Sequence, residues 1–182
     1  MHHSYRDEEE RRRWQNPEEI LADVGVQPST IFIDLGCGSG FYAIPAAKII
    51  GPKGVVCGVD IDSEALDELR ERAFKADLRN IRVKQAPAEN VSLCERCADM
   101  AFIGIALHDF NDPLKVLQNA KRALKPNGRL ANVDWKKEPM PFGPPLEIRL
   151  SEKEAASLII KAGFNVESVR SSGPYHYIIS AH

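Results

Sequence analysis

A glycine-rich segment, Ile31–Phe41, constrains the fold of this chain more than any other feature. Its sequence, IFIDLGCGSGF, has a short apolar run that ends in Asp34 and is followed by glycines at alternate positions, Gly36, Gly38 and Gly40. The apolar run predicts a buried strand, and the glycines predict a tight turn into a helix. Glycine lets a backbone approach a ligand closely because no Cβ stands in the way. We therefore expect a strand–turn–helix unit that binds a ligand at the turn.

A second apolar run, Val55–Asp60, also ends in an acid and follows about twenty residues later. In nucleotide-binding α/β units, a carboxylate at this place accepts hydrogen bonds from the hydroxyls of a ribose. The glycine spacing indicates which nucleoside is bound. The G-x-G-x-x-G pattern of a dinucleotide site would need glycine at the position of Phe41. The turn therefore favours a ligand without a pyrophosphate, and NAD is the least expected cofactor.

Together these two segments resemble the first two motifs of class I S-adenosylmethionine-dependent methyltransferases, of the small-molecule type that includes UbiE-like and arsenite methyltransferases. The resemblance implies that the three turn glycines line the methionine part of the cofactor. It also implies that Asp34 lies near the amino end of the methionine and that Asp60 holds the ribose. Further cofactor contacts are implied for Cys37, Phe41, Ile61, Ala88, Glu89 and Ile105. No metal ion is expected in the site.

Strands alternate with helices along the chain, which is typical of a parallel sheet covered on both faces. The expected strands are 31–34, 55–60, 81–84, 100–104, 129–135, 166–169 and 175–181. The expected helices are 17–24, 41–50, 63–76, one that begins at 112, and 151–163. We predict an α/β, Rossmann-like three-layer sandwich with a seven-stranded, mostly parallel sheet whose last strand is antiparallel. This order also matches the class I methyltransferase plan.

Two helix starts have side chains that can accept backbone N–H groups. Ser63 is the expected N-cap of the helix 63–76, and Ser151 with Glu154 predicts a capping box at the start of the last helix. Helical spacing of apolar residues predicts a buried face on the first of these helices. That face comprises Leu66, Leu69, Ala73 and Phe74.

The segment after the third strand departs from the family pattern. The family usually places a polar residue followed by alanine there, at the adenine pocket, but this chain has Pro87 before Ala88. Proline has no backbone donor. We therefore expect the adenine to be held by the neighbouring backbone or by Glu89.

Candidate catalytic residues follow the fourth and fifth strands, where the methyl donor should face the acceptor. Methyl transfer from a sulfonium needs a base only if the nucleophile carries a proton; orientation and exclusion of water supply much of the catalysis. His108 is the candidate base because histidine titrates near neutral pH; the alternative is a capping or polar pocket residue. Asp134 and Lys136 are the candidates after the fifth strand. Lys136 and Lys137 either attract an anionic acceptor or form solvated ion pairs with Glu138 and Glu147.

The N-terminal segment, residues 1–16, has acids four residues before bases, so Asp7, Glu8 and Glu9 can pair with the three arginines that begin at Arg11. The segment is either a solvated helix or a lid over the cofactor pocket, with Tyr5 or Trp14 as apolar contacts. We divide the chain accordingly into a lid-like segment, 1–16, and a methyltransferase domain, 17–182.

The four cysteines are expected to be reduced and mostly structural. Cys37 and Cys57 fall in the turn and in a buried strand, where a small apolar side chain is sufficient. Cys94 and Cys97 form a lone C-x-x-C, which is a weak signal for a metal or arsenic site. Because this pair precedes the fourth strand, it should lie at the edge of the sheet opposite to the ligand.

Length and charge narrow the function further. A chain of 182 residues fits one α/β domain, and its net charge of −2, with both signs interspersed, gives no sign of nucleic-acid binding. No apolar run is long enough to span a membrane, and no signal-peptide pattern precedes the glycine turn. We expect a cytoplasmic enzyme that methylates a small molecule, with a pocket completed by the N-terminal helix or by a second subunit in a homodimer. The alternatives are methylation of RNA or protein, or a catalytically silent S-adenosylmethionine-binding protein.

Overall fold

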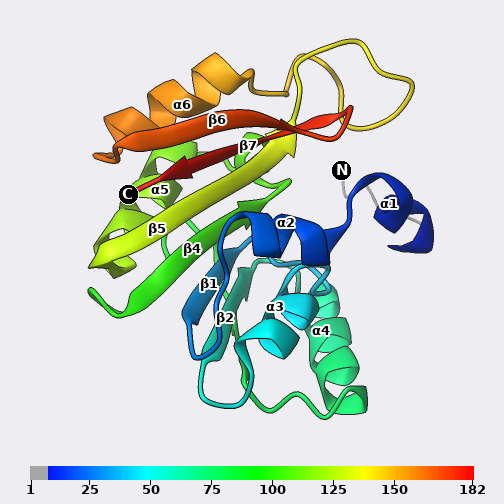
Figure 1. Ribbon diagram of the computed structural model, residues 1–182, viewed down its shortest axis with the longest axis vertical. Helices are drawn as coiled ribbons and strands as arrows, with labels where there is room; N and C mark the ends of the chain where they lie inside the picture. The colour runs from blue at the N-terminus through cyan, green and yellow to red at the C-terminus, as the bar shows by residue number, and fades with distance from the viewer. Residues whose placement is uncertain (1–7) are drawn as a thin grey trace.

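The computed structural model describes residues 8–182, so Tyr5 and Asp7 lie outside the described residues. One sheet runs through the middle of the molecule, with helices on both faces (Figure 1). Its order in the described chain is β3–β2–β1–β4–β5–β7–β6. The strands are β1 (Ile31–Leu35), β2 (Val55–Asp60), β3 (Ile81–Gln85), β4 (Ala98–Gly104), β5 (Leu124–Trp135), β6 (Val166–Ser172) and β7 (His176–Ala181).

The pairing confirms the predicted sheet. β1 to β5 are parallel to one another, whereas β7 lies between β5 and β6 and is antiparallel to both. The chain moves outward from β1 through β2 to β3 and then returns to the other side of β1 with β4. In open α/β sheets, ligands bind at such a reversal, beyond the carboxyl ends of the strands. The carboxyl ends of β1 and β4 therefore define the place of the candidate site.

The helices are α1 (Glu8–Trp14), α2 (Pro17–Asp23), α3 (Ala43–Ile50), α4 (Ser63–Lys75), α5 (Pro113–Ala123) and α6 (Glu152–Lys161), with a short 3₁₀ turn at Leu107–Asp109. α2, α3 and α4 pack on one face of the sheet, against a core that includes Phe32 and Phe102. α5 and α6 pack on the other face, against Ile103 and Leu130. None of the helices formed by the described residues is long and apolar enough to cross a membrane.

Two details of α4 differ from the prediction, whereas α6 agrees with it. The N-cap of α4 is Asp62 and not Ser63, because the Asp62 carboxylate accepts the N–H groups of Glu64 and Ala65. Phe74 is 85% exposed, since it lies one residue past the buried face and is turned away from the sheet. The capping box of Ser151 and Glu154 is present as predicted.

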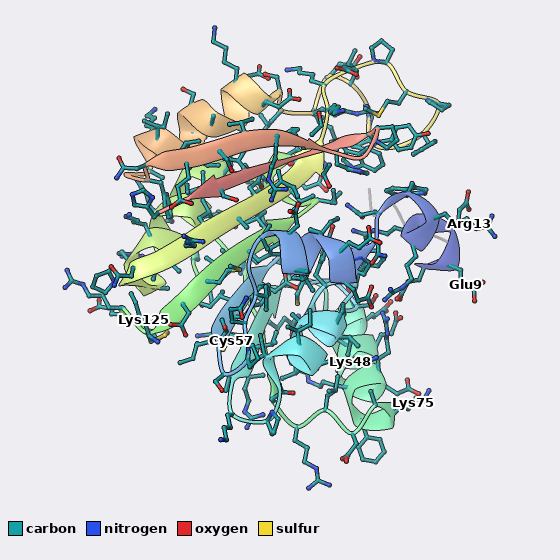
Figure 2. All side chains as sticks on the ribbon, in the orientation of Figure 1. Glu9, Arg13, Lys48, Cys57, Lys75 and Lys125 are labelled. Atoms are coloured by element: carbon teal, nitrogen blue, oxygen red, sulfur yellow. A yellow bond between two sulfur atoms is a disulfide. The ribbon has the colours of Figure 1, made fainter. Side chains whose placement is uncertain are left out.

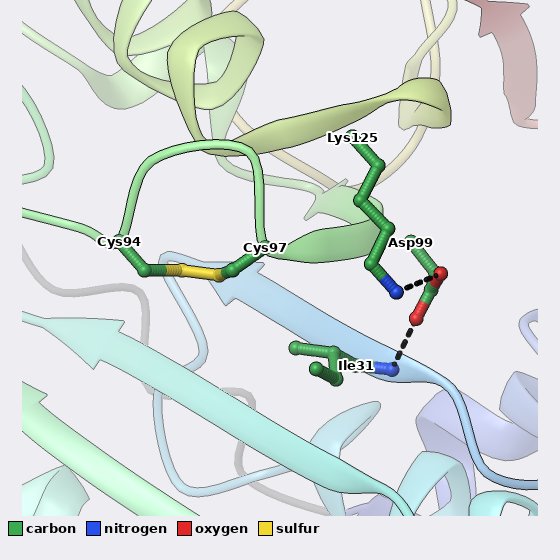
Figure 3. The surroundings of a disulfide bond; sticks show 5 residues. All are labelled: Ile31, Cys94, Cys97, Asp99 and Lys125. Carbon is green, nitrogen blue, oxygen red and sulfur yellow. Dashed lines mark hydrogen bonds and ion pairs between the residues drawn. A yellow bond between two sulfur atoms is a disulfide. The ribbon is translucent and has the colours of Figure 1, made fainter.

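The expectation that all four cysteines are reduced is wrong for one pair. Cys94 and Cys97 form a disulfide, because their short loop brings the two Cα atoms to 5.9 Å, within bridging distance. Figure 3 shows this loop beside the start of β1, where Asp99 accepts the Ile31 N–H and pairs with Lys125. The disulfide therefore lies at the amino edge of the parallel strands, opposite to the candidate site, as predicted. Cys37 and Cys57 are free.

Asn80 fastens α3 to the sheet. Its Nδ2 donates to the carbonyl oxygens of Ala47 and Gly51, both at 2.9 Å, at the end of α3. The backbone carbonyl of Asn80 accepts the Val56 N–H. We expect Asn80→Ala to lower the free energy of unfolding by about 1–3 kcal/mol, because the helix-end carbonyls lose a buried donor. Urea denaturation measures this. The exposed Asn165→Ala is the control and should change stability by less than about 0.5 kcal/mol; equal losses in the two variants would contradict the assignment.

Candidate functional site

The glycine turn after β1 has a backbone that only glycine adopts easily. Gly36 and Gly40 have φ angles of +79° and +91°, in the left-handed region. A Cβ on Gly36 would lie 2.7 Å from the Cβ of Ala106, and one on Gly40 would collide with Leu69 of α4. Gly38 differs, because no described residue other than its own chain neighbours comes within 4 Å of the place where its Cβ would stand. The turn is thus closely packed against Ala106 at Gly36 and against Leu69 at Gly40, and it is open at Gly38.

Asp60, at the end of β2, is bonded directly to the turn. One carboxylate oxygen accepts the Gly38 N–H at 2.7 Å, and the other accepts the Asp62 N–H at 3.0 Å. The Val59 carbonyl accepts the N–H groups of Gly36 and Cys37. The residue predicted to hold the ribose therefore also fixes the turn predicted to hold the methionine.

Asp34, at the end of β1, is buried, and its Oδ2 has no hydrogen-bond partner among the described residues. Burial, reinforced by the negative charge of Asp60 and opposed by Arg11, raises the pKa of Asp34 to about 7. A buried carboxylate oxygen without a donor is costly unless a ligand supplies one. A cationic amino group bound at this position would do so. The chemistry of the turn therefore fits an amino acid joined to a nucleoside, as in S-adenosylmethionine.

Four other predicted cofactor residues lie around this turn. The Cys37 side chain packs against the backbone of Gly58, where a Cβ would collide with its sulfur. Burial raises the pKa of the Cys37 thiol, so the side chain acts as a small apolar group. Phe41 is buried, whereas Ile61 is 60% exposed. Ile105, after β4, has a φ of +60°, which is strained for a β-branched residue. Such strain is frequent at ligand sites, but the cofactor contacts of these residues stay predictions.

The predicted adenine segment is tied to the start of α5. Glu89 Oε1 accepts the N–H groups of Asn111 and Asp112, at 3.0 and 3.3 Å. The side chain of Asn119 donates to the carbonyls of Ala88 and Glu89. Glu89 thus orders the loop before α5 in addition to its predicted cofactor role. A contact of Ala88 or Glu89 with adenine stays a prediction.

His108 and Asp134, predicted from separate segments, are brought together by the carboxyl ends of β4 and β5. His108 Nδ1 lies 2.7 Å from Asp134 Oδ1, and both side chains are almost fully buried. Burial lowers the pKa of His108, but the hydrogen bond and the negative charge of Asp134 outweigh it, so the pKa lies above its ordinary value. A carboxylate that fixes one imidazole nitrogen leaves the other to exchange a proton. The pair has the arrangement of an oriented general base.

Lys136 does not join this pair. Its Nζ lies 3.2 Å from the carbonyl oxygen of Pro174 and 3.4 Å from that of Gly173, in the turn between β6 and β7. Lys137 pairs with Glu154 of α6, so the two lysines have separate partners. The catalytic role of Lys136 stays a prediction.

The structure adds an aromatic cluster, Trp14, Trp135, Phe142, Tyr175 and His176, which the sequence analysis did not assemble. His176 stacks on Trp14, with ring centroids 5.3 Å apart, and lies 4.3 Å from Trp135. Burial lowers the pKa of His176 to about 3, so this imidazole is neutral. Its Nε2 and the Trp135 Nε1 are buried without a hydrogen-bond partner in the described chain. The cluster is therefore closely packed around two buried polar atoms.

Two arginines shape the surroundings of the cluster. Arg149 is 4% exposed and donates to the carbonyls of Pro144 and Glu138, which fixes the loop between β5 and α6. Arg11 of α1 stacks on Phe41, with its guanidinium carbon 3.6 Å from the ring centroid. No motif in the sequence points to Arg149, and the charge pattern around Arg11 predicts ion pairs along the helix and not this contact with Phe41, because both contacts depend on long-range packing.

Comparisons with known proteins show the family of the chain. Residues 27–168 match the family model described as "Methyltransferase domain". A demethylmenaquinone methyltransferase from Listeria monocytogenes serotype 4a (strain HCC23) is 32% identical over 129 residues, which cover 71% of this chain and 54% of that relative. The chain thus spans about half the length of the curated relatives it matches.

Solved structures extend the likeness over nearly the whole chain. A SAM-dependent methyltransferase from Aquifex aeolicus has a TM-score of 0.89 and 33% identity, and the match covers 94% of this chain and 91% of that one. The cyclase SpnF shares the fold alone, with a TM-score of 0.79 at 14% identity over 91% of this chain and 80% of its own. Because the fold also occurs in a cyclase, the sequence match and not the fold decides the family. The chain belongs to the S-adenosylmethionine-dependent methyltransferase family.

Proposed function

We propose that this chain transfers the methyl group of S-adenosylmethionine to a small-molecule acceptor at the carboxyl edge of β1, β4 and β5. One observation supports the proposal most directly. The unpartnered, buried oxygen of Asp34 lies at the end of β1, beside a turn that is open at Gly38 and bonded to Asp60. A ligand with an amino group and a ribose satisfies all three features.

The chain's own residues would bind and orient the cofactor. Asp34 accepts the amino group, Asp60 accepts ribose hydroxyls, and the open face of Gly38 lets the methionine part approach the backbone. When bound, S-adenosylmethionine supplies an activated methyl group on a sulfonium. Cys37, Phe41, Ile61, Ala88 and Ile105 would form the walls, and α1, in the described part of the N-terminal segment, would form the lid.

His108 is the proposed general base for an acceptor that carries a proton on its nucleophile. Asp134 holds Nδ1–H, so that Nε2 is left to take the proton, and it stabilises the imidazolium that results. Asp109 Oδ2 lies 3.5 Å from Nε2 and adds negative charge at the same side. The base is therefore most effective above the raised pKa of His108.

The aromatic cluster supports a planar, aromatic acceptor. Trp135 and His176 are each 1% exposed and form the packed base of the cluster, whereas Trp14 and Tyr175 are half-buried and Phe142 is 38% exposed. These three outer rings would stack on the acceptor. The relatives in Listeria are named for a quinone-type acceptor, which agrees with this chemistry. The homodimer, the cytoplasmic location and the absence of nucleic acid from the reaction stay predictions.

Cofactor affinity should depend on the Asp60 carboxylate. We expect Asp60→Ala to weaken S-adenosylmethionine binding by at least roughly tenfold, because hydrogen bonds to a charged group typically contribute about 1.5–3 kcal/mol. Isothermal titration calorimetry measures this. Asp67→Ala, which removes an exposed acid of α4, is the control. If Asp60→Ala binds like the unaltered chain, the ribose assignment is wrong.

Cofactor affinity should also rise with pH through the pKa of Asp34, which is about 7 in the ligand-free protein. Below pH 7 the carboxyl is protonated and cannot compensate a cationic amino group; above pH 7 it is charged and can. We expect tighter binding at pH 8 than at pH 6. Asp34→Asn should lower the affinity at pH 8 and flatten this dependence. Isothermal titration at both pH values tests this prediction. If the affinity of Asp34→Asn still rises with pH, another group is responsible for the pH dependence.

The raised pKa of Asp34 affects the stability of the ligand-free protein in the opposite direction: cofactor affinity should rise with pH, whereas stability should fall. The folded pKa of Asp34 lies above its unfolded value, so the folded state holds this proton more tightly. Stability from this group therefore falls as pH rises from the ordinary pKa of aspartate towards 7. Asp34→Asn should unfold at a higher temperature than the unaltered chain at pH 8, which separates loss of binding from loss of folding.

His108→Ala should keep cofactor binding and slow turnover by about 10²–10⁴-fold. Formation of S-adenosylhomocysteine with a panel of hydroxylated aromatics, thiols and amines measures turnover. Asp134→Asn removes the charge that raises the His108 pKa, so the rise of rate with pH should move to lower pH. Unchanged turnover in His108→Ala would make this residue structural. Cofactor binding without turnover on any acceptor would favour the silent binding protein.

A further inference from the structure

Arg72 of α4 connects two parts of the site that are far apart in sequence. One guanidinium nitrogen donates to the carbonyl oxygen of Ser39, in the glycine turn, at 2.9 Å. Another donates to the carboxylate of Glu8, at the start of α1, at 2.5 Å. The guanidinium is a planar fork with donors in several directions, so one side chain can make both contacts. We call this arrangement the Glu8–Arg72–Ser39 bridge.

The glycine-turn end of the bridge rests on a rigid support. Leu69, one turn before Arg72 on α4, is fully buried and fills the space beneath Gly40. The Asp60 carboxylate accepts the N–H of Gly38, the residue before Ser39. The Ser39 carbonyl is therefore fixed in place, and a change in the turn's geometry would be felt at Arg72.

The α1 end of the bridge acts on a helix that reaches the aromatic cluster. α1 lies beside the carboxyl edge of the sheet (Figure 1), and Glu9 and Arg13 lie on its outer side, away from the sheet (Figure 2). The inner contacts are Arg11 on Phe41 and Trp14 on His176. No residue of α1 is buried, so side-chain contacts hold the helix in position; they include the ion pair of Arg12 with Glu18 of α2.

We propose that Arg72 is a positioning residue that couples the docking of α1 to the conformation of the cofactor-binding turn. The inference rests on the proposed function, since it deepens the role of the same site. Cofactor bound against the turn stabilises the Ser39 carbonyl and hence the arginine that holds Glu8. The docked helix in turn places Arg11 and Trp14 over the site. Because coupling of this kind is reciprocal, cofactor stabilises the docked helix to the extent that the docked helix raises cofactor affinity.

Two measurements on the full chain test the coupling. Calorimetry gives the affinity for S-adenosylmethionine, and limited trypsin digestion with mass spectrometry gives the cleavage rate after Arg11, Arg12 and Arg13 in α1. In the unaltered chain, the cofactor should slow cleavage in α1. Arg72→Gln should weaken binding by roughly tenfold, within the usual range of such couplings, and should speed cleavage whether or not cofactor is present.

Variants on either side of the bridge make the test specific. Glu8→Gln removes the contact with Arg72 and also the Glu8–Arg12 ion pair within α1. Glu8 lies outside the core, and its substitution should speed cleavage in α1 as Arg72→Gln does. Arg72→Lys keeps the charge but lacks the fork, so it should restore part of the lost affinity. Arg70→Gln is the matched control, because Arg70 lies on the same helix and pairs locally with the exposed Asp67. It should change neither measurement.

The outcomes separate the bridge from the proposed function. If the unaltered chain binds no S-adenosylmethionine, the proposed function fails. If it binds and Arg72→Gln binds equally well, the coupling is overturned while the function stands. Weaker binding in Arg72→Gln with unchanged cleavage in α1 would also overturn the coupling, because Arg72 would then support the turn alone. Faster cleavage in both Arg72→Gln and Glu8→Gln, with Arg70→Gln unchanged, supports it.

Discussion

The hydrogen bonds from the glycine turn to the end of β2 are the constraint on which the rest of the site depends. The Val59 carbonyl and the Asp60 carboxylate receive three N–H groups of the turn, and these bonds bring the turn close enough for α4 to pack beneath it. A side chain at Gly36 or Gly40 would prevent this approach. The ligand surface is consequently made of backbone, which has little freedom to reorganise when a ligand binds. Such preorganisation reduces the entropy lost on binding.

The carboxyl edge of the sheet concentrates polar groups that the fold itself leaves unsatisfied. Asp34 and His176 lie on the face covered by α2 and α3, whereas His108 and Asp134 lie between β4, β5 and the α5 side of the molecule. Among the described residues, Asp34 Oδ2 and His176 Nε2 are buried without partners; His108 and Asp134 contact each other at 2.7 Å through Oδ1, whereas Asp134 Oδ2 is also without a partner. The amino edge of the same strands contains ordinary pairs, such as Asp99 with Lys125.

Much of the fold could be predicted from the sequence because its signals are local. Alternating strand and helix patterns, the glycine turn and the capping box at Ser151 each depend on residues that are neighbours along the chain. The error at the start of α4 is also a local one. Asp62 and Ser63 are both good N-caps, and only the backbone geometry decides between them. His108 and Asp134 were each predicted as site residues. Their contact could not be predicted, because it depends on the register in which β4 pairs with β5. The roles of Arg11, Arg72 and Arg149 could not be predicted, because each bonds to partners chosen by tertiary packing.

The disulfide at the amino edge has a consequence for the environments this fold tolerates. Cys94 and Cys97 enclose only two residues, and a loop this short loses little conformational freedom when it is closed. Its backbone is already held by the N–H groups of Arg96 and Cys97, which donate to the carbonyls of the last two residues of α5. Reduction would therefore free two thiols without freeing the chain. The same native structure can persist in oxidising and in reducing surroundings, with the cofactor site at the far edge unaffected by the change.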